Sequence, residues 1–228
     1  MKIVVMVVVI IWCNSFANAQ IDVLVDPRDG KEYKIAVIGS QVWMAENLKY
    51  APTIAKLYST HYYEHSRISF RGSKDYEVHP TSDVAAIYCY NDDSIVIARY
   101  GMLYTWNAAK DACPVGWHLP SEQEFEKLFL TIGGGDKEKA KQSLVIGGSS
   151  GFEATFCGCL FANFDGNNND ISKFDAMGGV MSYWSSTERT KRKAKAILIE
   201  KEKAMIGSDF HIENYYKGMG FSVRCIKD

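Results

Sequence analysis

The chain contains few side chains whose type and spacing could support catalysis. Cys157 and Cys159 are separated by one glycine, and two such thiols could bind a metal or exchange electrons. Neither a second cysteine pair nor a nearby histidine completes a metal site, so two cysteines at strand edges, one of them bridged, is the preferred interpretation. His118 could act as a general base, but neither a nucleophile nor an orienting acid can be assigned to it. We therefore predict no catalytic residue.

The polar loop DGNNND, residues 165–170, could hold calcium, since oxygen side chains alternate at Asp165, Asn167 and Asn169. Its glycine stands in the second position rather than the sixth, and no Glu stands at the twelfth. A turn-rich surface loop is the better interpretation. We predict no metal and no cofactor, and we treat Asp165, Asn167, Asn169 and Asp170 as a candidate binding loop.

Two predicted elements carry a cysteine on the face that points toward the core. Trp106, Ala109 and Cys113 recur at helical spacing, so a short helix over 105–113 turns the sulfur toward the core. In the closing segment GFSVRCIKD, Cys225 falls on the apolar face of a strand. The two cysteines are suitably placed for a disulfide, which would restrict the unfolded chain by roughly 4–5 kcal/mol for a loop of about 110 residues.

A second helix is the most secure element. Ser121 and Glu124 form a capping box, apolar side chains then recur on one side, and the glycines at 133–135 end the helix. Four tryptophans could form a stacking platform for sugar rings, but most lie in apolar motifs, and we expect at least three of them to pack in the core. They are Trp43, Trp106, Trp117 and Trp184.

Strands are predicted on both sides of this helix. The reversal at Asp29 and Gly30 predicts an initial hairpin over residues 21–38. The basic run RTKRKAK, residues 189–195, is typical of an exposed hairpin tip. Residues 51–84 lack any period and predict a long surface excursion. Glu46 and Arg224 are lone charges in apolar motifs, and either a partly buried ion pair or two exposed charges would fit.

The whole chain limits the class of protein. Its 26 basic and 27 acidic residues give a net charge of −1, which does not indicate a nucleic-acid partner. Residues 1–19 have a charged start, an apolar run and a small-x-small cleavage site, as in a signal peptide. That run is shorter than the ~20 residues that span a bilayer. We expect a secreted or cell-surface protein that does not span the membrane, with one domain over 20–228.

The cysteine count leaves the pairing partly open. Five cysteines follow the signal peptide, and an odd number in an exported protein predicts bridges plus one remaining thiol. If Cys113 and Cys225 pair, at most one further bridge forms among Cys89, Cys157 and Cys159.

Several long motifs occur in an order that resembles the Fibrobacter succinogenes major paralogous domain family, from about Asp26 to Asp228. They are DPRDGKEYKIAVIGSQVWMAENL, CYNDD, RYGMLYTWNAAKDACPVGWHLPSEQEF, GFEA, YWSST and GFSVRCIKD. That family is in turn similar to C-type lectin-like and formylglycine-generating-enzyme-like folds. The resemblance implies a single compact α+β domain of the C-type lectin-like kind, with two short helices, small antiparallel sheets and neighbouring chain ends. It also supports the Cys113–Cys225 bridge.

The sequence departs from the family in one respect. Members often carry a second cysteine shortly before the YG pair, and residues 96–98 are Val-Ile-Ala here, which leaves Cys89 without its usual partner. Cys157 and Cys159 are candidates to replace it. The sugar-binding triplets of calcium-dependent lectins do not occur in the sequence.

These observations predict a non-catalytic surface or adhesive module. It would bind a cell-wall glycan or an envelope protein through its long loops. Two alternatives are an oxidoreductase-like enzyme of the formylglycine-generating type, which would use Cys157 and Cys159, and a purely structural envelope component.

Overall fold

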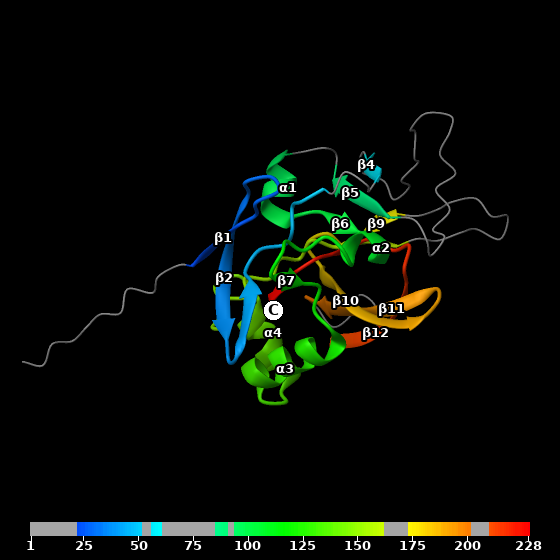
Figure 1. Cartoon of the computed structure of the whole chain (residues 1–228). Coiled ribbons are helices and arrows are strands. Elements are labelled where there is room, and N and C mark those ends of the chain that lie inside the picture. Colours follow the sequence, from blue (N-terminus) through cyan, green and yellow to red (C-terminus); the bar gives the residue numbers. More distant parts are fainter. Residues whose placement is uncertain (1–21, 52–55, 61–84, 91–93, 162–172, 202–209) are drawn as a thin grey trace, which may run out of the picture.

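The computed structural model describes residues 22–51, 56–60, 85–90, 94–161, 173–201 and 210–228 (Figure 1). Its helices are α1 (Ser94–Tyr100), α2 (Trp106–Ala109), α3 (Glu122–Gly133) and α4 (Lys137–Leu144). Its strands are β1 (Val23–Val25), β2 (Glu32–Ile38), β3 (Gln41–Met44), β4 (Lys56–Thr60), β5 (Ala86–Tyr90), β6 (Leu103–Tyr104), β7 (Trp117–His118), β8 (Cys159–Phe161), β9 (Lys173–Asp175), β10 (Val180–Thr190), β11 (Lys193–Glu200), β12 (Phe210–Tyr216), β13 (Phe221–Ser222) and β14 (Ile226–Lys227).

A five-stranded antiparallel sheet joins the two ends of the described chain. Its strand order is β1-β2-β3-β14-β7, so the closing strand β14 lies between β3 and β7. The predicted initial hairpin is confirmed, because β1 pairs antiparallel with β2. Gly30 has a φ of 72° in the turn, and its N–H donates to the carbonyl of Asp26 at 2.8 Å. Few residues other than glycine adopt such a φ readily.

The second sheet corrects the expectation of small antiparallel sheets. It has seven strands in the order β12-β11-β10-β13-β6-β5-β4, and the pairs β4·β5 and β10·β13 are parallel. A separate two-stranded sheet contains β8 and β9. The expected basic hairpin tip is confirmed, since Lys191 and Arg192 are exposed in the turn between β10 and β11.

The helices also exceed the two that the sequence predicted. The first predicted helix is present but shorter, as α2, and the second is α3. Its capping box is complete: the Ser121 hydroxyl accepts from the Glu124 N–H, and the Glu124 carboxylate accepts from the Ser121 N–H at 2.7 Å. Helices α1 and α4 are additional. In the part of the chain that the structure describes, no helix is both long and apolar enough to cross a membrane.

An aromatic cluster packs α3 against the sheets. The ring of Trp43 lies 5.2 Å from that of Phe125 and 5.6 Å from that of Phe152, and Tyr183 contacts Phe152 edge-on. Trp43, Trp106 and Trp184 are buried, as predicted for three of the four tryptophans. The described residues therefore form one compact α+β domain.

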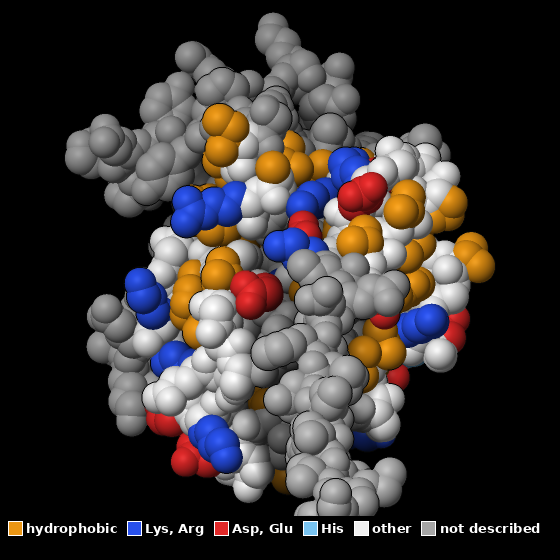
Figure 2. Space-filling model, turned by 90° about the vertical axis from the view of Figure 1, so that its left-hand side faces the viewer, with side chains coloured by type: hydrophobic (Ala, Val, Ile, Leu, Met, Phe, Trp, Pro, Cys, Tyr) orange, Lys and Arg blue, Asp and Glu red, His pale blue; other side chains and the backbone are white. Residues whose placement is uncertain are grey.

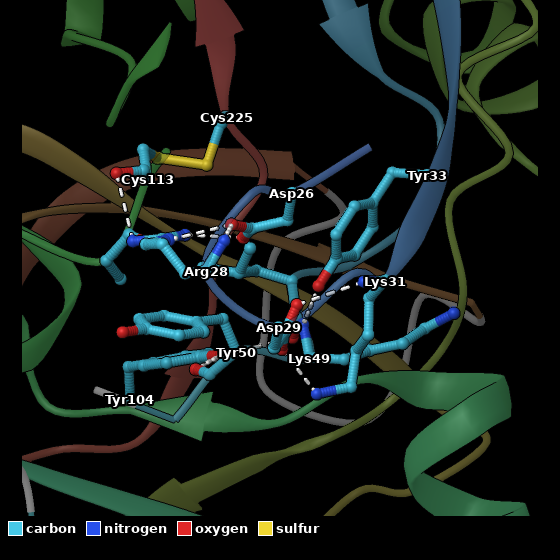
Figure 3. Close-up of polar contacts among 12 residues, drawn as sticks. Asp26, Arg28, Asp29, Lys31, Tyr33, Lys49, Tyr50, Tyr104, Cys113 and Cys225 are labelled. Carbon is cyan, nitrogen blue, oxygen red and sulfur yellow. Dashed lines mark hydrogen bonds and ion pairs between the residues drawn. A yellow bond between two sulfur atoms is a disulfide. The ribbon is translucent and has the colours of Figure 1, made fainter. Parts of the chain in front are cut away.

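A disulfide and an arginine connect distant segments of this domain (Figure 3). Cys113 and Cys225 form the bridge that the sequence predicted, with their Cα atoms 5.9 Å apart. The Arg28 guanidinium donates to the Asp26 carboxylate at 2.7 Å and to the Cys113 carbonyl at 3.3 Å. It also lies 3.6 Å from the centre of the Tyr50 ring. The first hairpin is thereby held against the disulfide.

Candidate functional site

A hollow of about 340 Å³ lies where β2, the segment after β3, helix α1, the segment after α4 and the segment before β14 meet. In Figure 2 basic and acidic side chains lie close together near the middle of the face shown. The residues that line the hollow are Lys34, Ala45, Glu46, Asn47, Lys49, Ala98, Arg99, Ile146, Glu153, Thr155 and Arg224.

Arg224 lies at the floor of the hollow, and its side chain is fully buried. Its Nε and Nη2 donate to Asn47 Oδ1 at 3.0 and 2.7 Å. Its Nη1 donates to the carbonyl oxygens of Met44, at 3.2 Å, and of Phe152, and its Nη2 also donates to that of Glu153 at 3.4 Å. Burial lowers the pKa of the guanidinium. The group stays cationic at neutral pH, however, because arginine does not deprotonate in proteins.

Glu46 does not form an ion pair with this arginine. Its Oε2 accepts from Lys49 Nζ at 2.6 Å, and its Oε1 accepts from the Lys34 N–H at 3.3 Å. Partial burial opposes ionisation of Glu46, but Lys49 outweighs it and lowers the carboxyl pKa. Neither option left by the sequence is therefore correct. Arg224 is buried, and neutral oxygens rather than a carboxylate accept its hydrogen bonds among the described residues.

Asn47 connects Arg224 to the walls of the hollow. Besides accepting from the guanidinium, its amide donates to the Tyr100 carbonyl at 2.8 Å and to the hydroxyls of Thr155 and Ser222, both at 3.2 Å. Gly101 follows α1 with a φ of 74°, and a Cβ there would lie 2.6 Å from Asn47 Cβ. Sequence analysis did not identify Asn47. The only indication was the position of this polar amide within the largely apolar motif WMAENL.

The hollow carries an excess of positive charge. Four cationic side chains face two carboxylates, namely Lys34, Lys49, Arg99 and Arg224 against Glu46 and Glu153. Lys34 and Arg99 are exposed, and no carboxylate of the described residues pairs with either. The Glu153 carboxylate accepts from the Gly147 N–H at 3.2 Å. The backbone of Glu153 has a φ of 54°, which is uncommon for a residue with a side chain.

His118 has carboxylates on both ring nitrogens. Its Nδ1 lies 2.6 Å from Asp228 Oδ1, and its Nε2 lies 2.9 Å from Glu124 Oε1. Partial burial opposes protonation of the imidazole, but the two carboxylates outweigh it and raise the pKa of His118. The orienting acids that the sequence could not assign are thus present. No Ser or Cys within the described ranges hydrogen-bonds to His118, and the nearby Ser121 hydroxyl donates to Glu124 instead.

Cys157 and Cys159 are both fully buried, and neither of these two described residues forms a disulfide, so the expectation that one of them is bridged is wrong. Cys157 Sγ lies 3.1 Å from Ser222 Oγ, and burial raises the pKa of its thiol. The reactive form of a cysteine is the exposed thiolate, so this environment does not favour nucleophilic or redox chemistry. Across the described ranges, no group of three or more His, Cys, Asp or Glu side chains could hold a metal ion.

The family model of the Fibrobacter succinogenes major domain matches residues 37–227. The chain belongs to this family. No curated protein and no solved structure matches it. The matched part of this Fibrobacter major domain includes every residue that lines the hollow except Lys34. The relation to C-type lectin-like and formylglycine-generating-enzyme-like folds stays a prediction.

The candidate binding loop of this domain is not placed by the structure. Asp165, Asn167, Asn169 and Asp170 lie outside the described residues, as do the predicted signal peptide, the side chain of Cys89 and residues 52–55 and 61–84 of the predicted surface excursion. The structure instead brings together a set of residues around Arg224 that sequence analysis did not assemble.

Proposed function

We propose that this member of the Fibrobacter major domain family is an exported, non-catalytic binding module that recognises a glycan or an envelope protein. One observation carries the proposal: the charged hollow is built on a buried framework whose polar groups bond to one another. Such a framework fixes the rim groups in place, which lowers the cost of ordering them when a ligand binds. Export is supported by the signal-peptide pattern and by the disulfide, which forms in oxidising compartments.

The two alternatives explain fewer of these observations. An oxidoreductase-like enzyme needs an accessible thiolate, whereas Cys157 and Cys159 are buried. A purely structural component gives no reason for Lys34 and Arg99 to stand without carboxylate partners among the described residues. The order of α2, the capped helix α3 and the closing strand β14, with a disulfide between the segment after α2 and the residue before β14, also supports a lectin-like relation.

An array of glycans, cell-wall polysaccharides and envelope proteins tests this proposal with the exported protein. Each probe should be run with calcium and with chelator. Two variants identify the binding region: Lys34→Ala with Arg99→Ala at the hollow, and Asp165→Ala with Asn167→Ala and Asn169→Ala in the loop. We expect binding that one of these variants abolishes and that Cys157→Ser leaves intact. Absence of binding to every probe, together with a redox activity that Cys157→Ser removes, would favour the enzyme.

A further inference from the structure

We propose that the hollow around Arg224 binds the carboxylate of an acidic sugar, so that the ligand is a glycan containing uronic acid. This inference rests on the function proposed above and names the ligand class of its site. Three features of the described residues support it: an unbalanced positive charge, acceptors suited to hydroxyl groups, and a small volume.

The positive charge has a buried and an exposed component. Arg224 is fully buried and has only neutral acceptors, so its field is screened less by water than that of a surface cation. Lys34 and Arg99 stand at the rim, where their donors can reach an incoming anion. None of these three cations forms an ion pair with a carboxylate of the described residues, so a ligand carboxylate would add the missing partner. Charge-assisted hydrogen bonds from Lys34 and Arg99 to it would be among the stronger kind.

The same hollow contains groups that suit sugar hydroxyls. The carboxylates of Glu46 and Glu153 line it and can accept hydrogen bonds from a ligand. The Thr155 hydroxyl lies beside them and can donate or accept. Ile146, which is 62% exposed, and Ala98 offer apolar surface to the C–H face of a sugar ring. A uronic acid carries one carboxylate and several hydroxyls, which matches this mixture of partners.

The two carboxylates also argue against a strongly acidic peptide. A run of aspartates offers no hydroxyl groups that could donate to Glu46 and Glu153, whereas a uronic acid offers several. The volume of about 340 Å³ is at the lower end of the roughly 300–1,000 Å³ of ligand pockets, which suits a sugar unit better than a broad protein surface.

Hydrogen bonds to the buried framework fix the geometry of Glu153 at the rim of the hollow. Glu153 keeps its positive φ while its carbonyl accepts from Arg224 and its carboxylate accepts from Gly147. A backbone conformation of this kind is costly for a residue with a side chain and persists only when its surroundings hold it. Such positions concentrate at ligand-binding sites. The carboxylate is therefore placed by the framework before a ligand arrives.

Titration calorimetry with three probes tests the inference on the exported protein. The probes are an oligogalacturonate, the same oligomer with every carboxylate methyl-esterified, and an aspartate oligopeptide of equal charge. We expect the oligogalacturonate to bind at least about tenfold more tightly than either of the others, because only it offers both carboxylates and hydroxyls.

Two double variants separate a specific site from general attraction. Lys34→Ala with Arg99→Ala should weaken oligogalacturonate binding at least about tenfold. Lys127→Ala with Lys139→Ala removes the same positive charge from exposed sites on α3 and α4 and should leave binding unchanged. All four side chains are exposed, so the fold should be retained.

Three results would overturn the inference: equal binding of the methyl ester, tighter binding of the aspartate peptide, or equal weakening in both double variants. If the protein does not bind oligogalacturonate but binds a neutral glycan or an envelope protein on the array, this inference alone is refuted. A protein that binds none of the probes would refute the proposed function as well.

Discussion

Removal of the Cys113–Cys225 bridge should lower the free energy of unfolding by several kcal/mol. The two cysteines are separated by 112 residues, and the chain-entropy model gives about 4.7 kcal/mol for a loop of about that length. Measured values are commonly smaller, so we expect a loss of about 2–5 kcal/mol for Cys113→Ala with Cys225→Ala. Cys225 is fully buried, and alanine leaves only a small gap and no unsatisfied polar group at its position.

Urea denaturation followed by circular dichroism measures this loss. The dependence of the unfolding free energy on urea should become steeper in the double variant, because the unfolded chain without the cross-link exposes more surface. Cys225→Ser alone should cost a similar 2–5 kcal/mol or so, through loss of the same cross-link. A loss below about 1 kcal/mol with an unchanged urea dependence would refute the reasoning. Peptide mapping that found Cys113 joined to another cysteine would refute it as well.

Three further changes test the framework of the hollow and the end of the chain. Arg224→Met should lower the unfolding free energy by about 2–4 kcal/mol in the same assay, because buried oxygens lose their donor, whereas Arg99→Met at the exposed rim should change it by less than about 0.5 kcal/mol. Gly101→Ala should lower the melting temperature by several degrees, since its Cβ would lie 2.6 Å from Asn47 at a positive φ; an unchanged melting temperature would mean that the turn can relax. The pKa of His118 is raised above 6.5, so its stabilising effect is complete below that pH and is lost as the pH rises through the raised pKa. His118→Gln should therefore make the melting temperature depend less on pH over that range. An unaltered pH profile would contradict the role of the two carboxylates beside His118.

The features that the sequence predicted correctly are encoded by neighbouring residues. The capping box needs only Ser121 and Glu124, and the first hairpin needs the reversal at Gly30. The Cys113–Cys225 bridge joins distant positions. The spacing placed both sulfurs toward the core, although Cys113 lies beyond the end of α2 and Cys225 lies between β13 and β14. Local patterns were sufficient for the capping box and the hairpin, and they indicated the direction of the two cysteines but not the elements that hold them.

The missed features depend on contacts that local patterns do not record. Helix α4 has the sequence KEKAKQSL, whose polar composition hides the apolar face that buries Ala140 and Leu144. Strand β4 lies within residues 51–84, where the sequence predicted only an irregular excursion, and no turn signal specifies its parallel pairing with β5. The contact between Asn47 and Arg224 spans 177 residues along the chain.

Arg224 shows why the candidate site could not be read from the sequence. Arginine is almost never fully buried unless it is paired, so its place in a short strand motif indicated an exposed or ion-paired side chain. Its burial is possible only because acceptors from two distant segments, residues 44–47 and 152–153, converge on one guanidinium. None of those acceptors is charged, and their residues show no distinctive spacing in the sequence, so no sequence pattern indicates them.

The chemistry of those acceptors bears on function. A buried guanidinium is costly to desolvate, and its hydrogen bonds must offset that cost. A carboxylate partner would cancel the charge locally, but here Glu46 lies close enough to favour the cation while it binds Lys49 instead. The field of Arg224 is therefore left to act on the hollow together with Lys34 and Arg99. Arg224 thus satisfies buried oxygens that a single apolar replacement would leave without a donor, and in addition its charge, which no ion pair cancels among the described residues, can act on a ligand.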